Sequence, residues 1–106
     1  MGGGGRRSGG KSRGFKLNDL YTHYTKHKND YPQISKFQYN SRAKELLDCI
    51  PNEKIKGFTN SSGWKFRYDK STNEFAIQRP DGTIATLFKP NEGIKYWEEQ
   101  VKKYDY

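Results

Sequence analysis

Two histidines, His23 and His27, stand four residues apart. Histidine is the side chain whose ordinary pKa lies near neutrality, so it can exchange protons at physiological pH. A neutral imidazole takes a proton from one oxygen, and an imidazolium returns a proton to another. Cleavage of RNA needs this proton transfer because the ribose 2′-hydroxyl, which supplies the nucleophile, must lose its proton. It also needs cations and hydroxyls that stabilise the phosphate. Acid–base catalysis on RNA is therefore one interpretation of the pair.

Two other interpretations of the histidines stay open. On a helix, Leu20, Tyr24 and His27 fall close together on the wheel, so His27 borders the apolar stripe and a packed, hydrogen-bonded histidine is the simplest reading. A shared metal ion is the other reading, but HYTKH lacks the glutamate of a zinc-protease motif and no third ligand stands out. We therefore expect no metal and no cofactor.

Four further side chains could stabilise a phosphate: Lys26, Arg67, Thr86 and Lys89. Each has a plain structural alternative. The two lysines could be solvated surface charges, Arg67 could pair with Glu74 across a hairpin, and Thr86 suits any strand. Residue type alone does not decide between these roles.

Aromatic residues make up 15% of a chain that is only 31% hydrophobic. With so few aliphatic side chains, most of the rings must build the core, and Trp64, Phe66 and Phe75 are assigned to it by default. A few rings, such as Phe88 and Tyr96, could instead stack on unpaired bases, a sequence-tolerant way of binding RNA.

The spacing of apolar residues predicts the elements that must position these groups. A helix is expected over Leu17–His27 with Asn18 or Asp19 as a cap, and a second from the capping box Ser35/Gln38 to about Cys49. A short strand is possible at 56–59, and three antiparallel strands at 64–69, 74–79 and 83–88 should form a meander, followed by a helix capped by Asn91. The order predicts an α+β fold, namely two N-terminal helices, a small antiparallel β-meander and a C-terminal helix packed on one face of the sheet.

Composition divides the chain into two parts. Residues 1–14 hold seven of the eleven glycines and four basic residues, which predicts a flexible linker, and residues 15–106 should form one domain. The net charge of +8 is shared equally between the two parts and favours a polyanionic partner, either nucleic acid or an acidic inhibitor protein. The single Cys49 excludes an internal disulfide, and no apolar run is long enough for a membrane span or signal peptide.

Several segments, taken in order, resemble a known family. These are HYTKH, the helix over residues 39–47, FRYDKSTNEFAI, PDGTIATLFKP and the segment over residues 93–96. Together they are similar to the C-terminal toxin domains of bacterial polymorphic and contact-dependent growth-inhibition toxins, in the barnase, EndoU, colicin and RelE-like ribonuclease superfamily. The resemblance covers about residues 17–100.

The resemblance implies a metal-independent endoribonuclease, often a tRNase, that leaves a 2′,3′-cyclic phosphate and is neutralised by a cognate immunity protein. It implies catalytic roles for His27, Thr86, Lys26, Arg67 and His23, and substrate-binding roles for Lys89, Phe88 and Tyr96. It also implies a monomer, delivered as the C-terminal part of a larger toxin, that acts on RNA in the target-cell cytoplasm.

Two other classes of function remain from the residues themselves. A non-catalytic RNA- or DNA-binding module would use the same basic surface and exposed aromatics without turnover, and it predicts salt-sensitive binding without cleavage. A protein-docking domain that uses the aromatic hairpin predicts neither.

Overall fold

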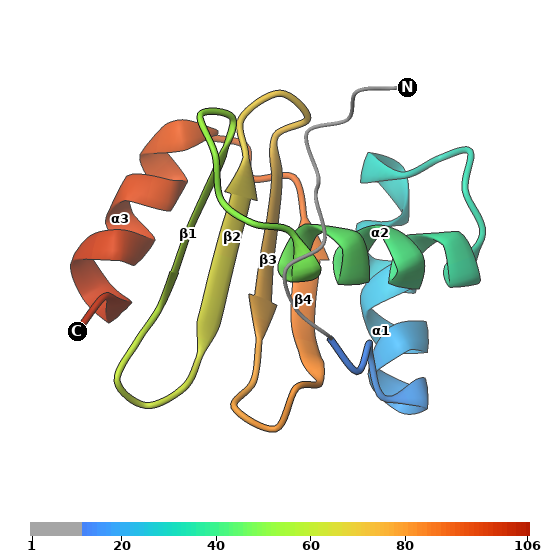
Figure 1. The fold of residues 1–106 in the computed structure, drawn as a ribbon. Helices are drawn as coiled ribbons and strands as arrows, with labels where there is room; N and C mark the ends of the chain where they lie inside the picture. The colour runs from blue at the N-terminus through green and yellow to red at the C-terminus, as the bar shows by residue number, and fades with distance from the viewer. Residues whose placement is uncertain (1–11) are drawn as a thin grey trace.

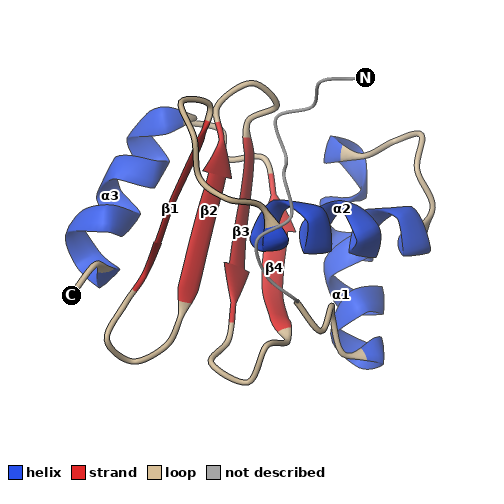
Figure 2. Cartoon of the chain, in the orientation of Figure 1, coloured by secondary structure: helices blue, strands red, loops and turns tan. Residues whose placement is uncertain are grey.

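The structure is a computed structural model that describes residues 12–106. Within this range the chain forms three α-helices, a short 3-10 helix and four strands (Figures 1 and 2). Their bounds are α1 (Leu17–His27), η1 (Lys28–Asp30), α2 (Lys36–Asp48), β1 (Ile55–Thr59), β2 (Lys65–Asp69), β3 (Glu74–Gln78), β4 (Ile84–Phe88) and α3 (Ile94–Tyr104). The predicted α+β class is confirmed, and each predicted element lies within a few residues of its expected place.

The four strands form one antiparallel meander in the order β1-β2-β3-β4. The turn between β3 and β4 is built as expected, because Asp81 accepts hydrogen bonds from the backbone and hydroxyl of Thr83 and Gly82 takes a φ of +92°. A register shift at Ile77/Gln78 interrupts the β3–β4 pairing. Beyond it, towards the end of β4, Thr86 pairs with Ile77 and Phe88 with Phe75.

Helices cover both faces of the sheet. On one face α3 packs over an aromatic cluster made by Phe66, Tyr68, Phe75 and Trp97, as predicted for the C-terminal helix. On the other face α2 buries Tyr39, whose hydroxyl donates to the Leu87 carbonyl, within a second cluster. In Figure 1, α2 crosses in front of the sheet and α1 lies beside its β4 edge. The core is therefore two layers separated by the sheet.

The capping box of α2 is confirmed. The Ser35 hydroxyl accepts from the Gln38 backbone at 3.1 Å, and the Gln38 side chain accepts from the Ser35 backbone at 2.7 Å. These two bonds satisfy two of the amide groups that a helix start leaves without intrahelical partners.

The predicted caps of the other two helices are wrong. Helix α1 begins after Lys16, and α3 begins after Gly93, neither with a side-chain cap. Asn91 lies too early to cap α3 because a turn from Pro90 to Gly93, closed by a 3.2 Å backbone hydrogen bond, comes first. Gly93 takes a φ of +59° at that point, which only glycine adopts without strain.

Residues 12–14, which were predicted to belong to the flexible linker, are packed against the fold. Ser12 donates its backbone N–H to Asp48, Arg13 donates to Gly82 at 2.8 Å, and Gly14 accepts from Ile84 at 2.9 Å. The exposed backbone of the β3–β4 hairpin binds this segment whatever its glycine content, because unpaired edge groups favour a partner. The rest of the predicted linker, residues 1–11, lies outside the described residues.

Candidate active site

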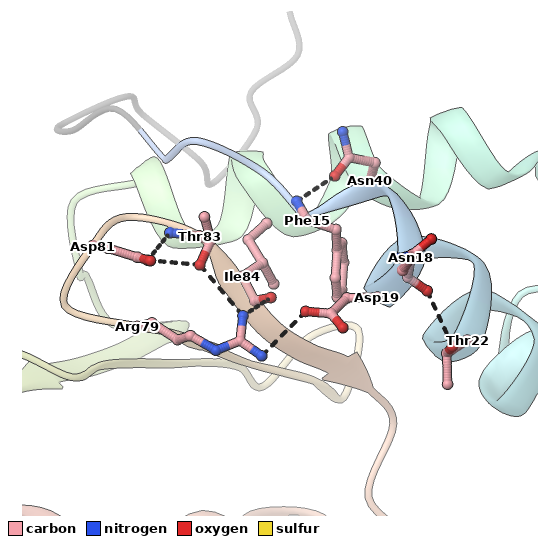
Figure 3. Close-up of polar contacts among 9 residues, drawn as sticks. All are labelled: Phe15, Asn18, Asp19, Thr22, Asn40, Arg79, Asp81, Thr83 and Ile84. Carbon is pink, nitrogen blue, oxygen red and sulfur yellow. Dashed lines mark hydrogen bonds and ion pairs between the residues drawn. The ribbon is translucent and has the colours of Figure 1, made fainter.

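Helix α1 and strand β4 lie side by side and run in the same direction. Near the start of α1, Asp19 accepts from the Arg79 guanidinium at 3.3 Å, and the same guanidinium donates to the Ile84 carbonyl at 2.8 Å (Figure 3). At the end of α1, the His27 ring stacks on Phe88 with centroids 5.2 Å apart. These two contacts fix the alignment of α1 against the full length of β4.

His23 stands one helical turn before His27 and therefore beside the middle of β4. The two imidazoles lie with centroids 6.0 Å apart, and His23 also packs on Phe15. Thr86 lies in the middle of β4, two residues from Phe88 and so on the same face as that ring. The structure thus brings both histidines and the threonine to one edge of the sheet.

Both histidines are half-buried, and this burial sets their charge. Burial lowers the pKa of His27 below its ordinary value, and the nearby His23 and Lys26 lower it further against an opposing effect of Asp30. Burial likewise lowers the pKa of His23, with Asp19 opposing and the cations Lys26 and Arg79 adding to the shift. Both rings are therefore neutral at pH 7 and able to accept a proton.

The Nδ1 atom of His23 is buried, and no side chain or backbone group among residues 12–106 bonds to it. A buried polar nitrogen without a partner is uncommon, and such atoms are concentrated where a ligand or water completes the site. His23 is therefore packed against Phe15 without a hydrogen bond to this nitrogen from the described residues, whereas the packed, hydrogen-bonded interpretation of His27 stays a prediction.

His27 opens onto a hollow of about 330 Å³. It is lined by Lys26, His27, Asn29, Asp30, Phe88, Lys89, Pro90 and Asn91. Asp30 accepts a 3.1 Å hydrogen bond from the Lys89 backbone and so joins the end of η1 to the end of β4. Two lysines beside a histidine give the hollow the charge that a phosphate requires.

Two aromatic rings connect the hollow to α3. Tyr96 meets Phe88 edge-on with centroids 5.5 Å apart, and Phe88 stacks on His27. Burial raises the pKa of Tyr96, so its phenol stays protonated at neutral pH and can only donate or accept hydrogen bonds. The predicted substrate-binding residues Lys89, Phe88 and Tyr96 are thus gathered at one place with His27.

Arg67 is the one predicted site residue that the structure places elsewhere. It pairs with Gly57 and Ala76 on the α2 face of the sheet, and its guanidinium donates to the carbonyls of Cys49 and Phe66. Alternation along β2 points it away from the face that carries Phe88. The possible pairing of Arg67 with Glu74 is also wrong, because the Arg67 guanidinium donates to those two carbonyls and the Glu74 carboxylate accepts from Arg42 of α2.

Sequence reasoning missed several residues of the site. Asn29, Asp30 and Asn91 line the hollow, and Arg79 holds the first turn of α1 against the start of β4. A signal for three of them was present, since they lie within three residues of His27 or Lys89. No such signal marked Arg79, because its contacts with Asp19 and Ile84 depend on the turn at 80–83 and on where α1 packs.

Neither a protein family model nor a curated protein matches this sequence. Among solved structures, the fold is similar to that of a ribonuclease from Escherichia coli complexed with its inhibitor protein. The TM-score is 0.51 at 18% sequence identity, and the alignment covers 74% of this chain and 95% of the ribonuclease chain. At this identity the similarity establishes the fold, and the expected membership of the toxin family stays a prediction.

Residues 12–106 contain neither a candidate membrane-spanning helix nor a candidate metal cluster. No helix there is long and apolar enough to cross a membrane. In the same part of the chain, no three histidine, cysteine, aspartate or glutamate side chains are grouped so that they could hold a metal ion.

Proposed function

We propose that this protein is an endoribonuclease that cleaves RNA by attack of a ribose 2′-hydroxyl on the adjacent phosphate, without a metal ion. The observation that carries the proposal is a pair of neighbouring half-buried histidines at the α1–β4 edge, of which His27 lines a hollow together with Lys26 and Lys89. The fold that it shares with a solved ribonuclease is consistent with this role.

The proposed reaction uses one neutral and one protonated imidazole. Neutral His27 accepts the proton of the 2′-hydroxyl while that oxygen forms a bond to phosphorus. The bond from phosphorus to the 5′-oxygen breaks, and His23 donates a proton to that oxygen from its imidazolium form, which is the minor form at pH 7 because burial lowers its pKa. The products are a 2′,3′-cyclic phosphate and a free 5′-hydroxyl. Rings 6.0 Å apart cannot share a hydrogen bond, so each is free to serve a different oxygen of one phosphate.

The neighbouring groups stabilise the charge that develops on the phosphate. Lys26 and Lys89 supply positive charge at the hollow, and Thr86 supplies a hydroxyl on the same strand face as Phe88. We assign no phosphate role to Arg67, because its guanidinium is buried on the opposite face of the sheet.

The finer parts of the proposal rest on the motif resemblance. They are a tRNA substrate, a toxic role neutralised by a cognate immunity protein, a monomeric state, and delivery to the target-cell cytoplasm as part of a larger toxin. Expression in bacterial cytoplasm tests the toxic role. We expect growth arrest that a neighbouring open reading frame relieves, and unimpaired growth would contradict it.

The first experiment incubates the purified protein with total bacterial RNA in EDTA and maps the ends of any fragments. Discrete fragments with cyclic-phosphate ends, absent with His27→Ala, are the expected result. Lys28→Ala is a matched control because Lys28 follows His27, is exposed and does not line the hollow. Cleavage at the wild-type rate by a folded His27→Ala variant would contradict the mechanism. Salt-sensitive RNA binding by the wild type without cleavage would favour a non-catalytic RNA- or DNA-binding module.

A further inference from the structure

A second hollow lies on the α3 face of the sheet, with a volume of about 410 Å³. It is lined by Asn60, Trp64, Phe66, Ile77, Tyr96, Gln100, Tyr104 and Tyr106. Five of these eight side chains are aromatic, although the surface of a small protein is mostly polar and aliphatic. We call this hollow the aromatic pocket.

The aromatic pocket has a built floor and exposed walls. Phe66 is buried and stacks on Tyr104 with centroids 5.6 Å apart. Trp64 and Tyr104 remain 36% and 42% exposed, so their rings are available to a ligand. Tyr106 is held to the β1–β2 turn, because Ser61 donates to its carbonyl at 2.7 Å and Ser62 lies 3.3 Å from its hydroxyl. The walls are therefore positioned before anything binds.

Two amide side chains line the pocket. Gln100 is 7% exposed and lies on α3. Asn60 is committed to the β1–β2 turn, because its side-chain oxygen accepts from Ser62 and Trp64 at 3.0 Å each. An amide has two donors and an acceptor, a pattern that matches the edge of a nucleobase. Gln100 thus offers edge recognition next to rings that offer stacking.

Packed side chains connect the pocket to the candidate active site. Tyr96 lines the pocket and also contacts Phe88, which stacks on His27. Ile77 lines the pocket and is the cross-strand partner of Thr86. An RNA chain with one phosphate at the α1–β4 edge would reach the pocket by way of Tyr96.

We propose that the aromatic pocket binds one unpaired base of the RNA chain, next to the cleaved bond, through Trp64, Tyr104 and Gln100. This inference rests on the proposed function, because it takes the RNA backbone to lie at His27. An unpaired base is the occupant that the lining favours, since it is flat, stacks on aromatic rings and presents hydrogen-bonding edges. The basic groups at the adjoining edge favour a phosphate-linked ligand over a protein side chain.

The test measures binding separately from cleavage. The probe is a short oligoribonucleotide with 2′-O-methyl groups, which has no free 2′-hydroxyl and cannot be cleaved by the proposed route. We expect Trp64→Ala and Tyr104→Ala each to weaken binding of this probe about 5- to 150-fold, the factor for loss of one base stack. Phe37→Ala is the matched control, because Phe37 is 67% exposed and lies on α2, away from the pocket.

A second probe identifies what the pocket binds. An oligonucleotide with abasic residues keeps the phosphates but lacks the bases, so Trp64→Ala should bind it as well as the wild type does. Gln100→Leu should make the affinities for probes with the four different bases similar, because it removes the polar contact with the base edge and keeps the side-chain volume. Circular dichroism of each variant shows that the fold is retained.

The outcomes separate the pocket from the proposed function. Cleavage by the wild type with equal probe binding by all three variants would overturn the pocket and leave the ribonuclease. Equal loss of affinity for base-containing and abasic probes would also overturn it, since the rings would then act on the backbone. A wild-type protein that neither binds nor cuts RNA would overturn both.

Discussion

The His27 side chain is both packed against the protein and open to a hollow. Its ring is packed against Phe88, and it still faces a hollow with two lysines. Packing favours the neutral imidazole, which is the form that accepts a proton. A helix-surface histidine would keep its ordinary pKa and a fully buried one could not reach substrate, so half-burial is what makes His27 suitable for acid–base work.

The lowered pKa values predict the pH dependence of cleavage. If His27 acts as base and His23 as acid, activity requires one neutral and one protonated ring. Because both pKa values are lowered, each imidazole loses its proton at a pH below the ordinary histidine value of about 6.5. We therefore expect kcat/KM to be highest below pH 6.5. A pH–rate profile for a defined RNA checks this, with His23→Asn expected to lose the high-pH limb. A maximum at pH 8 or above would contradict the assignment.

Lys26 and Lys28 provide a test of charge at single-residue resolution. Lys26 lines the hollow, whereas Lys28, two residues later, does not. Lys26→Ala should weaken RNA binding and reduce the slope of log affinity against log salt by about 1, because one phosphate contact is lost. Lys28→Ala has the same change in net charge and should leave the slope nearly unchanged. Equal slopes for both variants would mean that only net charge matters.

At the scale of elements, one buried carboxylate joins three parts of the chain. Glu74 at the start of β3 is fully buried and receives two hydrogen bonds from Arg42 of α2, at 2.8 and 2.7 Å. It also accepts from Tyr31 at 2.8 Å and from Thr72 at 2.7 Å. Burial together with the neighbouring Glu74 carboxylate raises the pKa of Tyr31, so that phenol stays a donor. The segment after η1 is thereby fixed to the sheet close to Lys89, whose ammonium lies 5.2 Å from the Tyr31 ring centre.

Arg42→Ala should therefore destabilise the fold strongly. It removes the bidentate partner of a buried carboxylate, which costs on the order of 3 kcal/mol. Chemical denaturation measures the free energy of unfolding, and Glu45→Ala, an exposed change on the same helix, is the control. A loss below about 1 kcal/mol would show that the ion pair contributes no more than a surface pair.

The elements themselves could be predicted from sequence, whereas their placement could not. Period-two alternation and the Ser35/Gln38 capping box located the strands and α2, because both signals are local. That α2 and α3 take opposite faces depends on the packing of Tyr39 and Trp97, which no local pattern encodes. Arg67 was misplaced for the same reason, since β2 is buried on both faces and alternation alone could not say which face holds the site.

At the scale of the whole molecule, the site lies where three contributions meet. Helix α1 supplies the histidines, β4 supplies Thr86 and Phe88, and α3 supplies Tyr96, which also lines the aromatic pocket. These elements are separated by much of the chain, so the site exists only in the folded state. Spacing within HYTKH predicted the histidine pair, but the contact of His27 with Phe88 requires the tertiary fold.

Folding and protonation of the histidines are therefore linked. Both rings have pKa values lowered in the folded state, so the unfolded chain binds more protons than the folded one as pH falls from 6.5. Their contribution to stability is fully present above the unfolded value of about 6.5 and is lost as pH falls through the lowered folded values. Melting temperature should consequently fall between pH 7.5 and 5.

A matched variant separates the histidines from the carboxylates that titrate at lower pH. The double variant His23→Asn, His27→Asn has no group that titrates in this window at the α1–β4 edge, so its melting temperature should change less from pH 7.5 to 5 than that of the wild type. Thermal unfolding followed by circular dichroism at several pH values makes the comparison. Parallel curves for the two proteins would show that the half-buried histidines do not couple folding to pH. A steeper fall in the wild type would instead mean that the same burial that keeps the proton acceptors neutral also destabilises the fold in acid.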